Sequence, residues 1–138
     1  QDWFASNRNV WDMGCGTGVL SIMAKKCGAT TVVAVDIDDK SVANTLENAQ
    51  SNAVELDVRL SSTPPDGEYD LILANIHRNI LIEHMPAYAK NLREGGELWL
   101  SGFYKEDIAY LTQAAEQVGL KHTETNCHNE WQWLRLKK

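Results

Sequence analysis

Residues 10–18 read Val-Trp-Asp-Met-Gly-Cys-Gly-Thr-Gly and decide the fold of this 138-residue chain. An apolar stretch runs into three glycines at alternate positions, and a second apolar stretch follows them. Because glycine has no Cβ, such a loop can turn tightly and let a ligand approach its backbone closely. The next apolar run ends in Asp36, whose carboxylate can accept two hydrogen bonds from the 2′,3′-diol of a ribose. The pattern predicts an α/β sheet that binds a nucleoside.

The spacing of the glycines distinguishes between kinds of nucleoside site. The dinucleotide fingerprint is Gly-x-Gly-x-x-Gly. Counted from Gly14, its third glycine would fall at Val19, so the spacing disfavours a nicotinamide-dependent oxidoreductase. Asp12 ends the first expected strand, and we expect it to hold the backbone N–H groups of the loop.

Hydrophobic periodicity alternates between strand and helix patterns along the whole chain. We expect a turn at 94–96 and a kink or break in one helix at Pro86. The order predicts an α/β, doubly wound, mostly parallel seven-stranded sheet with an antiparallel C-terminal strand. The expected strands are 9–13, 31–36, 56–60, 69–75, 97–102, 122–126 and 131–136, and the expected helices are 19–26, 40–52, 80–92 and 107–118.

Composition narrows the function classes. A length of 138 residues with 43% hydrophobic residues suits one domain. The net charge of −6, without a basic stripe, argues against direct nucleic-acid binding, and no apolar run is long enough for a membrane span. Three cysteines without a Cys-x-x-Cys pair indicate a reducing compartment, so we expect a cytoplasmic protein. We also expect a monomer. His122, Cys127 and His128 fit no zinc spacing, and no metal is expected.

Asn75 ends the fourth expected strand, in Ala-Asn-Ile. Open α/β sheets bind ligands at the carboxyl ends of their strands, so Asn75 is a candidate for contacting the reacting group. Its amide carbonyl can accept a hydrogen bond from an amine or hydroxyl. The alternative is that Asn75 caps the helix that follows. His77 could accept a proton near the site, but a surface position at the start of that helix is the favoured interpretation.

Several short motifs of the chain, taken together, resemble those of a known family. The motifs fall in order from Val10 onward and resemble the PrmA family, the methyltransferases of ribosomal protein L11. They are the glycine loop with Val-Leu-Ser-Ile, Val-Asp-Ile-Asp at 35–38, Glu-Asn-Ala at 47–49, Ala-Asn-Ile at 74–76, Gly-Gly-Glu-Leu at 95–98, Leu-Ser-Gly at 100–102 and Glu-Trp at 130–131.

The resemblance implies a class I, Rossmann-like methyltransferase domain that uses S-adenosyl-L-methionine. It implies that Gly14, Gly16 and Asp36 bind this cofactor, and that Asn75 lines the methyl-transfer pocket as both a cofactor-contacting and a catalytic residue. The implied substrate is ribosomal protein L11, methylated on lysine side chains and on its N-terminal amine. Nucleic-acid and glutamine-amide enzymes of this class usually carry Asn-Pro-Pro-Tyr where this chain has Asn-Ile-His-Arg at 75–78.

Two departures from the family pattern stand out. His-Arg-Asn at 77–79 replaces residues that are small or apolar in many members. The family also carries a substrate-recognition domain, a cofactor loop and a helix before the first strand, whereas this chain begins a few residues before that strand. We therefore expect residues 1–138 to be one methyltransferase domain cut from a longer protein, with little or no activity alone. The alternatives are a class I methyltransferase for a small molecule and a non-catalytic nucleoside-binding domain.

Overall fold

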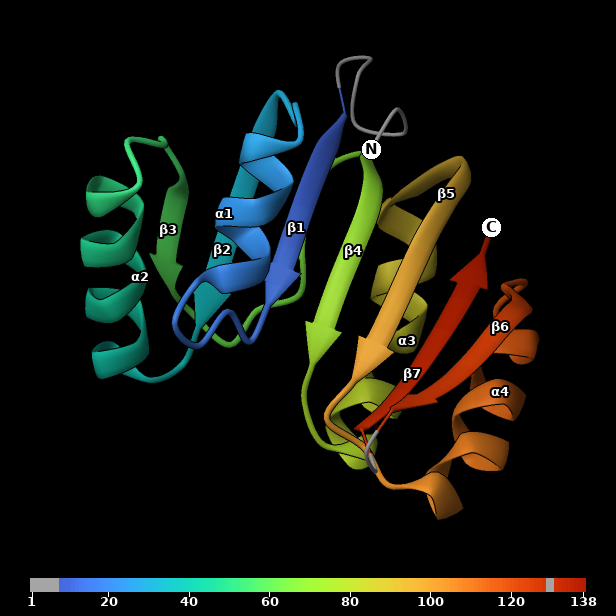
Figure 1. Cartoon of the computed structure of the whole chain (residues 1–138). Coiled ribbons are helices and arrows are strands. Elements are labelled where there is room, and N and C mark those ends of the chain that lie inside the picture. Colours follow the sequence, from blue (N-terminus) through green and yellow to red (C-terminus); the bar gives the residue numbers. More distant parts are fainter. Residues whose placement is uncertain (1–7, 129–130) are drawn as a thin grey trace. The chain divides into compact units, whose positions relative to one another are not determined.

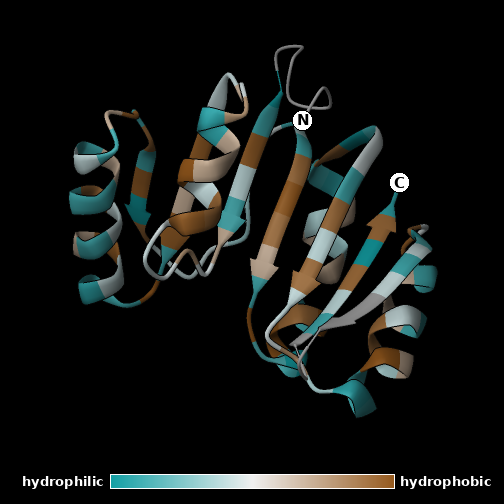
Figure 2. Cartoon of the chain, in the orientation of Figure 1, coloured by the Kyte–Doolittle hydropathy of each residue, from teal (hydrophilic) through white to brown (hydrophobic). Residues whose placement is uncertain are grey.

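The computed structural model describes residues 8–128 and 131–138. The chain divides into two compact units, residues 1–63 and residues 64–138, each with its own strands and its own pair of α-helices (Figure 1). Hydrophobic residues are concentrated in the strands of both units (Figure 2). In the described part of the chain, no helix combines the length and apolar character needed to cross a bilayer.

The first unit is a parallel βαβαβ segment. Strands β1 (Asn9–Met13), β2 (Thr31–Asp36) and β3 (Asp57–Leu60) pair in the order β3-β2-β1, with α1 (Val19–Lys26) and α2 (Asp39–Ser51) in the crossovers. Helix α1 packs on β1 and β2, α2 packs on β2 and β3, and the two helices contact each other. The centre of β2 is buried on both sides, as its nearly continuous run of β-branched residues predicts.

The second unit carries the antiparallel end of the sheet. Its strands pair in the order β4-β5-β7-β6; β4 and β5 are parallel, and β7 is antiparallel to both of its neighbours. Helix α3 packs on β4 and β5, α4 packs on β6, and both lie behind the sheet in Figure 1. The elements are β4 (Tyr69–Asn75), α3 (Arg78–Asn91), β5 (Leu92–Ser101), the 3-10 helix η2 (Lys105–Asp107), α4 (Ile108–Gln117), β6 (Lys121–His128) and β7 (Trp131–Lys137).

Two local expectations were wrong. The turn expected at 94–96 lies inside β5, where the pairing shifts so that Tyr69 faces Leu92 but Leu71 faces Glu97. The glycines are absorbed by this irregularity in the strand and do not reverse the chain. Of the kink or break expected at Pro86, the break does not occur: α3 continues through Pro86, and buried residues on both sides of it offset the one missing backbone hydrogen bond. The buried residues of that helix are Leu81, Met85, Tyr88, Ala89 and Asn91.

The other element positions agree with the predicted ones to within a few residues at each end. Of the Glu-Trp motif at 130–131, position 130 lies outside the described residues, and Trp131 begins β7.

Candidate functional site

The glycine loop, residues 14–18, is tied to the carboxyl end of β2. The backbone N–H groups of Gly14 and Cys15 both donate to the carbonyl oxygen of Val35, at 2.8 Å and 3.0 Å. Two consecutive donors on one acceptor fold the loop back over the end of β2. The loop therefore lies beside Asp36, the residue that follows Val35.

The Asp36 carboxylate is held by backbone donors on both sides. Its Oδ2 accepts a hydrogen bond from the Gly16 N–H at 3.0 Å, and its Oδ1 accepts one from the Asp38 N–H at 3.0 Å. An ionised carboxylate has about four lone-pair sites, so each oxygen can still accept a hydrogen bond from a ligand hydroxyl. Asp36 is half-buried. The structure thus brings together Gly14, Gly16 and Asp36, three of the four site residues predicted from the sequence.

Helix α2 supplies two residues of this region to which the sequence assigned no role, although Asn48 lies in the Glu-Asn-Ala motif. The buried Thr45 hydroxyl donates to the Gly16 carbonyl oxygen at 3.0 Å and contacts the Cys15 sulfur at 3.3 Å. The Asn48 carboxamide donates to the Thr17 carbonyl oxygen at 2.8 Å. Thr45 and Asn48 stand three residues apart, so they share one face of the helix. Their hydrogen bonds fix the carbonyl groups of the glycine loop.

The glycines at 16 and 18 meet different surroundings. A Cβ at Gly18 would lie 2.7 Å from the Thr45 Cγ2, so the loop and α2 approach too closely for a side chain there. A Cβ at Gly16 would meet no atom within 4 Å. The loop is therefore packed against α2 at Gly18, while open space remains at Gly16.

Asp12 lies near the end of β1, just before the loop, and is almost completely buried, at 1% exposure. Burial raises its pKa from 3.8 to about 6, the hydrogen bond from Ser21 opposes that shift, and the nearby charge of Asp36 adds to it. The Ser21 hydroxyl of α1 donates to the Asp12 Oδ2 at 2.5 Å. We expected Asp12 to hold the N–H groups of the glycine loop. The structure places its partner in the first turn of α1, because Ser21 faces inward there.

Asn75 ends β4 in the second unit, and its side chain is exposed. It pairs with Ser101 of β5, and the Ile76 N–H that follows donates to the Ser101 carbonyl oxygen at 3.2 Å. The N-cap of α3 is His77, so Asn75 is not the cap that the alternative interpretation required. Within the described part of the chain, the Asn75 carboxamide has no side-chain hydrogen bond, which leaves its oxygen and nitrogen available to a ligand.

The residues that depart from the family pattern lie at the start of α3. His77 is exposed and makes no side-chain cap, as the surface interpretation expects. Arg78 donates to Asp107 at 3.1 Å, and its guanidinium lies 5.0 Å from the centre of the Tyr110 ring. Arg78 thus links the start of α3 to the segment that begins α4.

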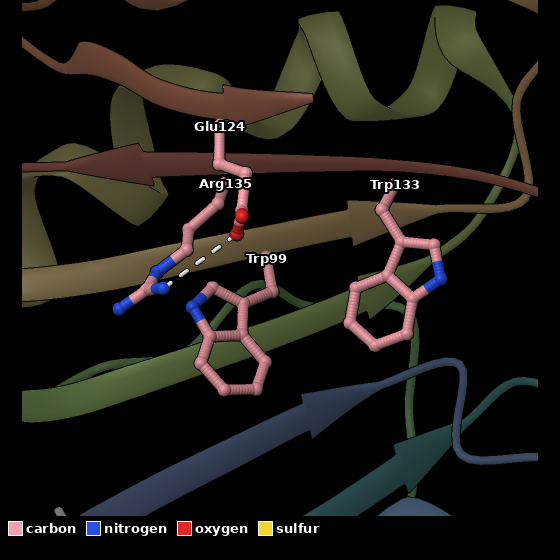
Figure 3. A pocket seen from close by; sticks show the side chains of 4 residues that line it. All are labelled: Trp99, Glu124, Trp133 and Arg135. Atoms are coloured by element: carbon pink, nitrogen blue, oxygen red, sulfur yellow. Dashed lines mark ion pairs between the residues drawn. The ribbon is translucent and has the colours of Figure 1, made fainter. Parts of the chain in front are cut away.

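A separate pocket lies on the sheet face of the second unit. It has a volume of about 130 Å³ and none of the predicted site residues lines it (Figure 3). The ring centres of Trp99 and Trp133 are 6.4 Å apart. The Arg135 guanidinium lies 5.6 Å from the centre of the Trp99 ring and forms an ion pair with Glu97. The lining residues are Trp99, Glu124, Trp133 and Arg135. The side chains around this pocket thus contact one another as an aromatic and ionic cluster.

Comparison with solved structures defines the class. A ribosomal protein L11 methylase from Lactobacillus delbrueckii subsp. bulgaricus superposes with a TM-score of 0.88 at 31% identity, over 95% of this chain and 70% of that one. A precorrin-6y C5,15-methyltransferase from Geobacter metallireducens superposes with a TM-score of 0.84 at 15% identity, over 96% of this chain and 82% of that one. The chain therefore has the mostly parallel, seven-stranded, doubly wound fold of the class I methyltransferases, as the sequence predicted.

Sequence comparison gives the family. The family described as ribosomal protein L11 methyltransferase (PrmA) matches residues 1–138, and the chain belongs to it. A ribosomal protein L11 methyltransferase from Porphyromonas gingivalis is 51% identical over 131 residues, which cover 92% of this chain and 45% of that protein. One from Thermosipho melanesiensis is 38% identical over 94% of this chain and 48% of its own length. The chain thus spans about half the length of these relatives.

Proposed function

We propose that this chain is the cofactor-binding and methyl-transfer part of a protein that methylates amines of ribosomal protein L11. The acceptors are lysine side chains and the N-terminal amine, and the donor is S-adenosyl-L-methionine. Family membership across residues 1–138 supports the activity, and relatives about twice as long support a further substrate-recognition part outside this chain. The observation that carries the proposal is the Asp36 carboxylate, held by the Gly16 and Asp38 N–H groups beside the glycine loop.

The residues of the first unit fit the proposed cofactor. The space at Gly16, where a Cβ would meet no atom within 4 Å, leaves the loop backbone open to a ligand. Asp36 beside it keeps acceptor capacity for a ribose diol. Gly14, tied to Val35, sets the path of the loop between the two strands. When bound, S-adenosyl-L-methionine supplies an activated methyl group that an amine can displace in line.

Asn75 has the role of orienting the acceptor amine. Its exposed carboxamide oxygen can accept an N–H of a neutral amine, which points the nitrogen lone pair away from Asn75. A lysine has an ordinary pKa of about 10.4, and a dry pocket lowers it by disfavouring the charged form. Because the donor is already activated, positioning supplies most of the rate and no dedicated base is assigned.

We also propose that the protein is a cytoplasmic monomer that does not bind nucleic acid directly. The net charge of −6 supports the lack of nucleic-acid contact, since phosphate binding depends on clustered basic residues. Cys15 and Cys27 are free thiols, in keeping with a reducing compartment.

The proposed function is tested by replacing Asn75 in the complete protein. With S-adenosyl-L-methionine and ribosomal protein L11, Asn75→Ala should lower kcat by about a hundredfold, as loss of a positioning group does. The matched control is His77→Ala, an exposed neighbour without a side-chain cap, which should keep kcat within about twofold. A wild-type kcat for Asn75→Ala would remove Asn75 from the reaction, and methylation of small amines in preference to the ribosomal protein would overturn the proposed substrate.

A further inference from the structure

The carboxyl ends of β4 and β5 meet at a glycine. Asn75 and Ser101 are directly paired, and the Ile76 N–H donates to the Ser101 carbonyl oxygen at 3.2 Å. Gly102 follows Ser101 with a φ of +84°, in the left-handed region that side chains other than glycine rarely adopt. The chain therefore turns away from the strand immediately beside the Asn75 carboxamide.

The approach of Gly102 to Asn75 leaves no room for a side chain. A Cβ at position 102 would lie 2.5 Å from the Asn75 Oδ1 and 3.0 Å from the Ile76 backbone nitrogen. Contacts this short require the carboxamide to move or the two strand ends to separate. Gly102 is itself exposed, so core packing does not account for the small residue there.

Two other glycines of the same unit share the left-handed backbone of Gly102 but have free space around them. Gly95 and Gly119 have φ values of +82° and +84°, and a Cβ at either would meet no atom within 4 Å. They require glycine for the left-handed backbone alone. Gly102 has the same backbone requirement, and a Cβ there would also collide with Asn75.

We propose that Gly102 is a positioning residue for methyl transfer, because the absence of a side chain at 102 leaves the space that the Asn75 carbonyl oxygen occupies. This inference rests on the proposed role of Asn75 and deepens it. Within the described residues, no side-chain hydrogen bond fixes the carboxamide, so the packing of the Gly102 backbone against it limits where the oxygen can lie. A larger residue at 102 displaces that oxygen from the position that orients the acceptor amine.

The test compares Gly102→Ala with Gly119→Ala in the complete protein. Both substitutions place alanine at a φ of +84°, so both strain the backbone alike, but only the first meets Asn75. Gly102→Ala should lower kcat about tenfold or more while leaving the KM for S-adenosyl-L-methionine within about twofold, since the cofactor loop lies elsewhere in the sequence. Gly119→Ala should keep both constants within about twofold. Equal effects of the two substitutions on kcat would overturn the proposal.

A double-mutant cycle with Asn75→Ala separates this proposal from the proposed function. If Gly102 acts through Asn75, adding Gly102→Ala to Asn75→Ala should leave kcat unchanged within about twofold. A further tenfold loss in that background would contradict the proposal. A wild-type rate for Asn75→Ala alone would instead contradict the function assigned to Asn75. In urea unfolding, Gly102→Ala should cost less stability in the Asn75→Ala background than in the wild type, because only the contact with the Asn75 Oδ1 is removed there. Equal costs in the two backgrounds would also overturn the proposal.

Discussion

Replacing Asp12 by asparagine tests the electrostatic cost of burying a carboxyl group at the end of β1. Burial raises the pKa of Asp12 from 3.8 to about 6, with the charge of Asp36 adding to the shift. Between pH 3.8 and about pH 6, the Asp12 carboxyl is therefore protonated more in the folded protein than in the unfolded chain. The free energy of unfolding therefore falls as pH rises through this window. A shift of this size corresponds to about 3 kcal/mol, at 1.36 kcal/mol per pKa unit.

Asparagine has nearly the same shape as aspartate, can still accept the Ser21 hydroxyl, and is neutral at every pH. Asp12→Asn should therefore gain about 3 kcal/mol relative to the wild type between about pH 4 and pH 7. For a chain of this length, that gain raises the Tm of Asp12→Asn by about 10 °C relative to the Tm of the wild type. Urea unfolding at several pH values measures it directly.

The control is Asp66→Asn, which removes a carboxylate from an exposed loop. Its stability curve should run parallel to that of the wild type over the same pH range. A constant difference in the free energy of unfolding between Asp12→Asn and the wild type from about pH 4 to pH 7 would refute the assignment of a raised pKa to Asp12.

Two further predictions concern the same unit. Gly18→Ala should cost more stability than Gly16→Ala, by about 1–3 kcal/mol, because only the alanine at 18 meets Thr45. Thr45→Ser should relieve most of that difference, and equal costs at the two glycines in urea unfolding would count against the observed contact. Burial raises the pKa of the Cys15 thiol to about 11, so a maleimide at neutral pH should modify the half-exposed Cys27 and spare Cys15 until the protein unfolds. Peptide mapping by mass spectrometry that finds Cys15 labelled as fast as Cys27 would contradict this.

The parts of the site that are local in sequence could be predicted. The glycine loop, the strand before it and Asp36 at the end of the next strand all follow from the period of the apolar residues and from glycine chemistry. The structure adds the hydrogen bonds that connect them, from Gly16 to Asp36 and from Gly14 to Val35.

The contacts between distant residues could not be predicted in the same way. Thr45 contacts Gly16, which lies 29 positions earlier in the chain, and Asn48 contacts Thr17, which lies 31 positions earlier. Polar residues on a helix are ordinarily solvated, so their sequence pattern does not indicate such contacts. Only the packing of α2 against the loop turns them inward. The partner of Asp12 was missed for a related reason, because Ser21 differs little in sequence from a surface serine of an amphipathic helix.

Tertiary packing also outweighed the local preference of glycine and proline to interrupt a strand or a helix. The two glycines at 95 and 96 predict a turn, yet pairing with β4 and β7 keeps the chain in β5. Pro86 predicts a kink or break, yet α3 does not break there, because buried residues on both sides of the proline hold the helix against β4 and β5. Both cases show tertiary contacts exceeding a local preference of a few kcal/mol.

Calorimetric titration of the complete protein with S-adenosylhomocysteine and, separately, with NAD tests the central claim most directly. The wild type should bind S-adenosylhomocysteine and not NAD, and Asp36→Ala should abolish that binding because it removes the proposed acceptor of the ribose diol. Asp39→Ala, an exposed carboxylate in the first turn of α2, should leave the affinity unchanged. Binding of NAD alone would contradict the methyltransferase assignment, and unchanged affinity in Asp36→Ala would remove Asp36 from the ribose site.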